Sequence, residues 1–223
     1  MPAPHKRIYI DTETTGLDPN VHELLEVAMV IEELPEPAGW EDAIQTWGRK
    51  SLPPRWRGRF QSLCHAVLPS HRKRGTITRK WAQKIKPKHI ETATAKALEV
   101  NKYSPEEWAD AVDFNDIAQD VYNTLSQKGV TVIGSNPKFD LEFLKRACKE
   151  AGIKVEDKFF PFRPIDTRAL AFTAWGQNGR ANVGLDSLRE YLDLPKQGAH
   201  RALKDALDAR EVFYTALESL RVL

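Results

Sequence analysis

The sequence predicts an α/β domain built on a mixed sheet. Runs rich in apolar and β-branched residues follow one another in the first third of the chain, and later runs alternate with segments of helical periodicity. The chain has 223 residues, of which 41% are hydrophobic and 29% charged, which is typical of a globular protein. Because we find no internal repeat and no linker, we expect a single domain over residues 1–223.

Four short runs are predicted strands because they are rich in β-branched or aromatic residues. The first, Lys6–Asp11, ends in an acidic turn, and the second, Leu24–Glu32, is mostly apolar. A weaker third strand is predicted at Phe60–Leu68. The fourth, Val130–Gly134, is short and is followed by a turn.

Six segments carry apolar residues at helical spacing, as Ile117, Val121 and Leu125 do. The segments are Ile90–Val100, Pro105–Gln127, Phe139–Ala151, Asp166–Trp175, Leu185–Leu192 and Arg201–Leu220. Gly152 is a natural stop for the third of them. Helices that alternate with strands in this way flank the sheet.

The composition also excludes several classes of protein. No apolar run approaches the ~18 residues that a membrane span requires, and the longest candidate, Leu24–Ile31, contains Glu26. The first residues lack the apolar stretch of a secretory signal. Cys64 and Cys148 are too few for a disulfide framework or a zinc cluster. We therefore expect a cytoplasmic protein without a membrane partner.

Charge is unevenly distributed along the chain. Residues 43–90 contain 13 Lys and Arg and no Asp or Glu, so the remaining residues carry 20 basic and 31 acidic side chains. A basic segment on an acidic body is typical of a protein that binds a polyanion. Trp47, Trp56, Phe60 and Trp81 interleave with these cations, as bases stacking on the segment would require. A solvated loop with a small satellite core is the alternative.

Asp11 and Glu13 form the first candidate site. Side chains two apart on a strand point to the same face, so these carboxylates converge at the carboxyl end of the first strand. Two neighbouring carboxylates repel each other, and a divalent cation removes that penalty. An acidic turn without a ligand is the alternative.

The second candidate, Gly134–Asp140, follows the strand at Val130–Gly134 and opens a helix. This places Asp140 in the first helical turn, on the same rim of the sheet as Asp11. Helix capping by Asn136, with Asp140 favoured by the helix dipole, is the structural alternative.

The third candidate is His200 with Asp205. Five residues span about 140° around a helix, so both cannot face one point if both are helical. We expect His200 to lie in the loop before the helix and to reach the site that Asp205 faces. A histidine near its usual pKa of ~6.5 accepts a proton near neutral pH.

Together these segments resemble a known family. DTETTGL from Asp11, NPKFDLEFL from Asn136 and HRALKDA from His200 are similar to the three motifs of the DEDDh exonucleases, the DnaQ-like branch of the ribonuclease H-like superfamily. The resemblance extends from Tyr9 to about Leu217. It implies a ribonuclease H-like fold with a central mixed five-stranded sheet flanked by helices.

The resemblance also implies a 3′→5′ exonuclease that uses two Mg²⁺ or Mn²⁺ ions. Asp11, Glu13, Asp140 and Asp205 would be the metal ligands and His200 the general base. The related branch with tyrosine has that residue four positions before the last aspartate, where this chain has Arg201 and not tyrosine.

By the same resemblance, the 3′-terminal nucleotide would be lined by Thr12, Thr14 and Leu17, with Asn136 and Phe139 as further neighbours. The chain departs from the family pattern before the asparagine of the second motif, where histidine is frequent and Ser135 stands here. Pro137 also stiffens that turn. Both departures affect contacts to the nucleotide and remove no metal ligand.

Single-stranded or frayed DNA is the preferred substrate, with Arg72, Lys73 and Arg74 of the basic segment expected to follow its phosphates. RNA 3′-end processing is the alternative within the same enzyme class. A proofreading or docking subunit of a polymerase, or of another replication or repair protein, is the alternative outside it.

Overall fold

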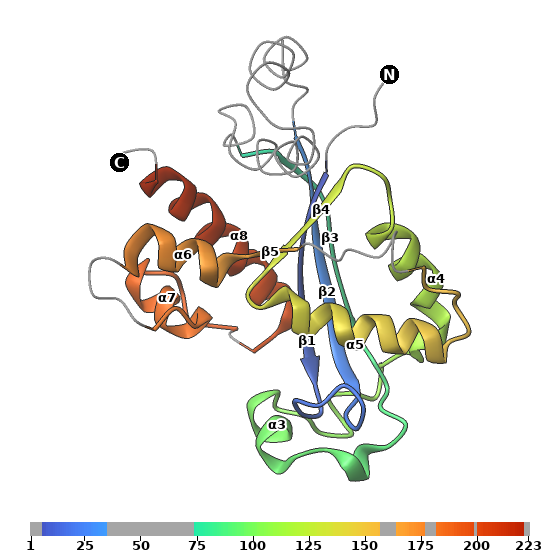
Figure 1. Ribbon diagram of the computed structural model, residues 1–223. Helices are drawn as coiled ribbons and strands as arrows, with labels where there is room; N and C mark the ends of the chain where they lie inside the picture. The colour runs from blue at the N-terminus through green and yellow to red at the C-terminus, as the bar shows by residue number, and fades with distance from the viewer. Residues whose placement is uncertain (1–5, 35–73, 157–163, 177–181, 199, 221–223) are drawn as a thin grey trace.

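A five-stranded mixed sheet forms the centre of the protein (Figure 1). The computed structural model describes residues 6–34, 74–156, 164–176, 182–198 and 200–220. The strands lie in the order β3-β2-β1-β4-β5, and β1 pairs antiparallel with β2 and parallel with β4. They are β1 (Lys6–Thr14), β2 (Leu24–Glu33), β3 (Thr76–Lys84), β4 (Val130–Gly134) and β5 (Ile165–Asp166). The predicted class is confirmed.

The third strand differs from the prediction. Phe60–Leu68 lies outside the described residues, and the strand beside β2 is β3, within the segment predicted as a basic insert. Its sequence, TITRKWAQK, is polar because β3 is an edge strand, where charged side chains at the exposed positions are common. Glu33 pairs with Thr76, so the connection between β2 and β3 leaves and rejoins the sheet at the same point.

Seven helical elements complete the described fold. They are the 3-10 helix η2 (Ile90–Thr92), α3 (Ala95–Val100), α4 (Phe114–Leu125), α5 (Pro137–Glu150), α6 (Thr167–Trp175), α7 (Leu185–Tyr191) and α8 (Ala202–Ser219). The helix predicted from Pro105 begins only at Phe114, because Asp113 caps it by accepting a hydrogen bond from the backbone N–H of Asn115. The other predicted helices are confirmed, with ends shifted by a few residues and the first split into η2 and α3.

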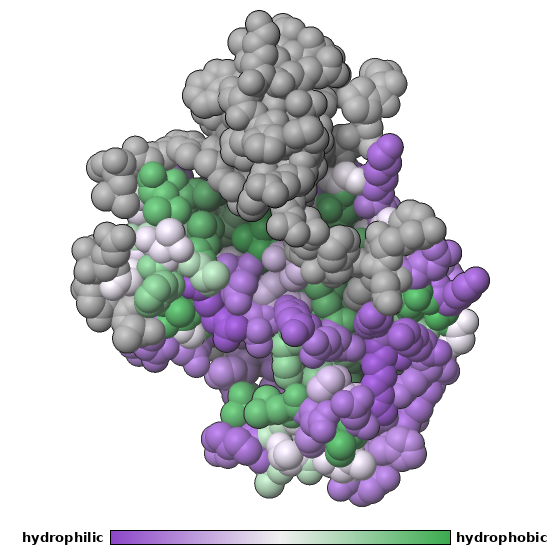
Figure 2. Space-filling view, viewed as in Figure 1, coloured by the Kyte–Doolittle hydropathy of each residue, from purple (hydrophilic) through white to green (hydrophobic). Residues whose placement is uncertain are grey.

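The helices lie in layers on both faces of the sheet (Figure 1). α4 and α5 pack on one face over a core that includes Ile8, Ile10 and Leu144. α8 packs on the other face against Tyr9 and Ile133, and α6 and α7 pack against α8. Figure 2 shows hydrophilic residues over α4 and α5 and hydrophobic ones over α6. None of the described helices is both long and apolar enough to cross a membrane.

The layers bring three chain segments to one end of the sheet. β1 and β4 are parallel neighbours, so the residues that follow them meet at the same edge. The start of α8 reaches this edge from the opposite face to α5. Residues after β3 stabilise this edge of the sheet through two hydrogen bonds to the end of β1. Thr94 donates its backbone N–H to the carbonyl of Thr15, and the Asn101 amide donates to the carbonyl of Thr14.

Candidate active site

Three carboxylates converge at this edge of the sheet. Asp11 and Glu13 extend from β1, and Asp205 comes from the first turn of α8. One ligand oxygen from each lies within 4.8 Å of the others. Three oxygen donors so close together fit a hard divalent cation such as Mg²⁺ or Mn²⁺, and we find no other such group among the described residues.

Asp140 borders this group from the first turn of α5. Its Oδ1 accepts hydrogen bonds from both the backbone N–H and the hydroxyl of Thr12, each at 2.8 Å. The turn before it is tight: a Cβ on Gly134 would lie 2.9 Å from the carbonyl oxygen of Ile10. Thr12 therefore fixes the orientation of the Asp140 carboxylate.

Burial raises the pKa values of all four carboxyls, and repulsion from the other site carboxylates raises those of Asp11 and Glu13 further. Burial is the main cause, and it raises the pKa of Glu13 to about 8, of Asp140 to about 7 and of Asp205 to about 6. The pKa of Asp11 also lies well above its usual value. Burial is the largest cause, and repulsion from Asp140 and Asp205 adds to it. Without a cation, protons occupy this site near neutral pH.

His200 lies in the loop before α8, as predicted. Its backbone has a left-handed φ of 60°, and α8 begins two residues later at Ala202. The Nε2 atom lies 4.0 Å from Oδ2 of Asp186. The charge of a protonated His200 lowers the pKa of Asp205, so the imidazole is near the carboxylates.

The predicted nucleotide contacts differ in their exposure. Leu17, three residues after the end of β1, is 83% exposed, whereas Thr12 and Thr14 are buried, and the Thr14 hydroxyl donates to the carbonyl of Gly16. Asn136, at a left-handed φ of 67°, precedes α5. Phe139 packs against the core, with its ring centroid 4.9 Å from that of Phe143. These contacts stay predictions, and Leu17 has the most accessible side chain of the set.

Of the three cations expected to follow the phosphates, Arg72 and Lys73 lie outside the described residues. Arg74 precedes β3 at the opposite end of the sheet from the carboxylates, roughly seven strand residues or ~23 Å away. Its guanidinium pairs with the Glu211 carboxylate at 2.8 Å and lies over the Tyr214 ring. Its positive charge is therefore already paired within the protein.

Lys84, at the end of β3, is a cation of the basic segment that lies nearer to the carboxylates. Lys84 lies opposite Glu26 in the sheet and stacks over the Trp108 ring, as Arg201 does from the start of α8. Both cations also pair with Glu107, at 3.7 and 3.5 Å.

Glu26 belongs to the site although the sequence analysis did not select it. It lies directly opposite Glu13 in the antiparallel register, is 7% exposed, and has an Oε2 atom without a hydrogen-bond partner among the described residues. Its carboxylate accepts the backbone N–H of Ala202, which ties β2 to the start of α8. Burial raises its pKa. The signal in the sequence was an acidic residue inside the otherwise apolar run Leu24–Ile31.

Arg189 is a second residue that the sequence analysis missed. It lies on α7, is 1% exposed, and pairs with Asp205. An arginine in a short amphipathic helix is usually exposed, so no local signal in the sequence indicated its burial.

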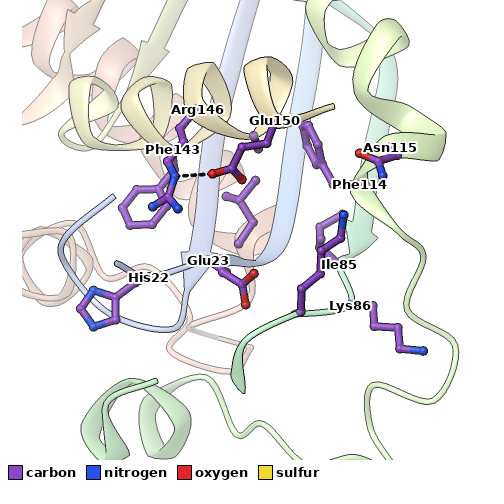
Figure 3. Close-up of a pocket in the computed structure, with 12 residues that line it drawn as sticks. His22, Glu23, Ile85, Lys86, Phe114, Asn115, Phe143, Arg146 and Glu150 are labelled. Atoms are coloured by element: carbon purple, nitrogen blue, oxygen red, sulfur yellow. Dashed lines mark hydrogen bonds and ion pairs between the residues drawn. The ribbon is translucent and has the colours of Figure 1, made fainter. Parts of the chain in front are cut away.

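A separate cleft lies on the α4 and α5 side of the sheet (Figure 3). Its lining combines apolar Ile85 and Phe143 with charged groups that pair locally, such as Arg146 with Glu150 at 2.6 Å. No group of acidic ligands is found there among the described residues. The carboxylate edge is therefore the candidate active site.

The chain is similar to known exonucleases. The RNase T family model, described as an exonuclease, matches residues 66–213. DNA polymerase III PolC-type of Caldanaerobacter subterraneus subsp. tengcongensis is 31% identical over 94 residues, 42% of this chain and 6% of that protein. The 3′-5′ exonuclease DinG of Staphylococcus epidermidis is 31% identical over 110 residues, 49% of this chain and 11% of that protein. The chain thus spans only a small part of these curated relatives.

Solved structures show the same fold. A structure of E. coli exonuclease I in complex with a dT13 oligonucleotide has a TM-score of 0.66 and 13% identity, covering 95% of this chain and 40% of that one. Another exonuclease I structure has a TM-score of 0.66 and 12% identity, covering 96% of this chain and 40% of that one. The predicted ribonuclease H-like fold is confirmed.

Proposed function

The chain belongs to the exonuclease family as a DnaQ-like 3′→5′ exonuclease domain, and we propose that it degrades single-stranded or frayed DNA with two divalent ions. The products would be nucleoside 5′-monophosphates and a shortened strand. The convergence of Asp11, Glu13 and Asp205, with Asp140 beside them, is the observation that carries this proposal.

The four carboxylates fit the metal ions that this chemistry requires. Asp11, Glu13, Asp140 and Asp205 would hold Mg²⁺ or Mn²⁺ through oxygen atoms, the donors that hard cations prefer. When bound, the ions supply positive charge that makes water more acidic and stabilises the negative charge developing on the phosphate. Four carboxylates also balance the charge of two divalent ions. This balance supports a count of two.

His200 is the proposed general base. Its position in a loop before α8 allows it to accept the proton of the attacking water while the carboxylates keep their places. The bond between phosphorus and the 3′-oxygen of the preceding nucleotide then breaks, and the 3′-oxygen takes a proton. Leu17, exposed beside this site, would pack against the terminal base.

We propose DNA and not RNA as the substrate because of what the similar proteins are named for or contain. The DNA polymerase III PolC-type protein acts with DNA by its name, and the exonuclease I structures contain DNA oligonucleotides. The PolC-type relative also favours a polymerase or another replication or repair protein as a partner. A cytoplasmic location belongs to the same proposal, and the buried thiol of Cys148 is free.

Cleavage assays with 3′- and 5′-labelled DNA and RNA strands test this function. We expect release of mononucleotides from the 3′ end of DNA, loss of activity in EDTA, and recovery with Mg²⁺ or Mn²⁺. Asp11→Asn and Asp205→Asn should fold, as circular dichroism would show, and should not cut. Robust cleavage by Asp11→Asn with excess metal would refute the assignment, and faster degradation of RNA would transfer it to the RNA-processing alternative.

A further inference from the structure

A buried arginine connects three carboxylates behind the active site. Arg189 donates from Nε to Asp208 at 2.7 Å, from one terminal nitrogen to Asp186 at 2.6 Å, and from the other to Asp205 at 2.5 Å. Arg189 is 1% exposed, and its planar guanidinium group fixes the direction of each hydrogen bond. The three carboxylates are therefore held in one arrangement by a single side chain.

The contact with Asp205 affects the candidate metal site directly. Arg189 donates to Oδ1 of Asp205, and Asp205 is one of the three residues whose ligand oxygens lie within 4.8 Å of one another. Neutralising Asp208 does not require Arg189, because Lys204 pairs with both oxygens of Asp208 at 2.5 Å. The burial of Arg189 is thus better explained by its contacts with Asp205 and Asp186.

The contact with Asp186 reaches the proposed general base. Asp186 lies in the first turn of α7 and accepts a hydrogen bond from Arg189 at Oδ1, while its Oδ2 lies 4.0 Å from Nε2 of His200. The imidazole is on a loop with a left-handed backbone and is 40% exposed, so its own surroundings restrict it little. Among the described residues, Asp186 is the carboxylate that pairs with the His200 imidazole.

We propose that Arg189 and Asp186 are positioning residues of the exonuclease reaction. Arg189 orients Asp205 so that one oxygen is presented to the metal, and it fixes Asp186, which in turn orients His200. One side chain thereby sets the relative position of a metal ligand and the general base. This inference rests on the proposed function, because it assigns the roles of Asp205 and His200.

The first test measures Mn²⁺ binding to the whole chain, which does not depend on activity. Arg189→Lys keeps the charge but loses the fork, and Arg189→Met loses both, so we expect both variants to bind Mn²⁺ about 10–100-fold more weakly. Arg210→Met is the matched control, because Arg210 is also buried and also pairs with a carboxylate, that of Glu32. This control should bind Mn²⁺ as the wild type does.

Two outcomes of this test would overturn the role of Arg189. Tighter Mn²⁺ binding by Arg189→Met would mean that Arg189 acts as a competing positive charge, and recovery of normal binding in Arg189→Lys would mean that charge alone matters. If Arg189→Met does not fold, Arg189→Lys still decides between charge and geometry. Thermal denaturation of each variant shows whether it is folded.

The second test concerns Asp186, whose side chain is 69% exposed, so that Asp186→Asn should fold normally. We expect kcat to fall by about 10-fold or more, within the 10²–10⁴-fold that a general base contributes, with KM and Mn²⁺ affinity unchanged. The same substitution in a His200→Ala background should cause no further loss. An equal loss of kcat in both backgrounds would overturn the role of Asp186.

The proposed function and this inference fail in different ways. A wild-type protein that cuts neither DNA nor RNA with Mg²⁺ would refute the proposed function. Mn²⁺ affinity would still decide the role of Arg189. For Asp186, the ring resonances of His200, assigned by comparison with His200→Ala, should shift in the spectrum of Asp186→Asn. Unchanged His200 resonances would refute the positioning of the imidazole by Asp186.

Discussion

Asp140 is oriented by a neighbour before any ion binds. A carboxylate with two hydrogen bonds to one oxygen cannot rotate freely, and both bonds come from Thr12, the residue between Asp11 and Glu13. The first motif therefore contains two of the proposed metal ligands and also orients a third. This explains why a polar but buried residue stands between the two acidic ones, a function that the sequence pattern did not indicate.

We expect Thr12→Val to lower activity about 10–100-fold, because it removes one of the two hydrogen bonds that hold Asp140 and keeps the β-branched shape. The measurement is kcat on a DNA oligonucleotide at saturating Mg²⁺. Thr12→Ser, which keeps the hydroxyl, is the control and should retain most of the activity. Equal kcat values for Thr12→Val and the wild type would show that the backbone N–H alone is sufficient.

At the scale of elements, the sequence predicted the strands and helices that are apolar or strongly periodic. β1, β2, β4 and α5 are buried and have clear patterns, so their positions were predicted to within a few residues. β3 was missed because an edge strand carries charged residues on its exposed positions, and β5 was missed because two residues form no pattern.

The candidate site follows the same division. The residues with a motif, Asp11, Glu13, Asp140, His200 and Asp205, were selected from the sequence, and the structure brings the four carboxylates together with the histidine nearby. Glu26 and Arg189 were not selected, since the contacts that bury them, with Ala202 for Glu26 and with Asp205 and Asp208 for Arg189, come from another element, α8. A buried charge is recognised by what packs around it, which local spacing does not encode.

At the same scale, we predict how the basic segment affects binding to a single strand. If Arg72 and Lys73 follow the phosphates, replacing both with glutamine should flatten the salt dependence of binding to a long single strand by ~0.7 in log–log slope per lost contact. Arg74→Gln should leave the slope unchanged, because Arg74 is paired with Glu211, and should change stability by no more than about 1 kcal/mol.

Salt titrations of the wild type, the Arg72/Lys73 double variant and Arg74→Gln check this prediction. A dinucleotide, too short to reach the segment, should be cleaved by all three proteins at similar rates. Equal slopes for the wild type and the double variant would favour the solvated loop. Normal DNA binding together with loss of association with a replication protein would favour the docking surface.

At the scale of the whole molecule, the active site destabilises the metal-free protein at high pH. The folded-state pKa values of Asp205, Asp140 and Glu13 are about 6, 7 and 8, above the ~4 expected for the unfolded chain. The folded state therefore holds more protons than the unfolded state between these values. The stability that these protons provide is lost as pH rises from about 4 to about 8.

We expect the Tm of the protein in EDTA to fall between pH 5.5 and pH 8.5, and we expect Mg²⁺ to raise Tm more at pH 8.5, because metal binding displaces those protons. Calorimetry at the two pH values, with and without Mg²⁺, provides the measurement. Asp205→Asn, with one titrating carboxyl fewer, should show a smaller decline in EDTA. An identical gain from Mg²⁺ at both pH values would contradict the shifted pKa values.

The return of the chain to the sheet beside its point of exit makes the β2–β3 connection a natural site for variation. Glu33 and Thr76 are paired, and the Gly75 backbone N–H bonds to the Tyr214 hydroxyl, so both ends of the intervening residues are anchored whatever their number. Closing a connection of 42 residues, from Leu34 to Gly75, instead of four costs only about 2 kcal/mol more in chain entropy. Evolution can therefore exchange, lengthen or delete this connection while Glu13 and Glu26 stay in register.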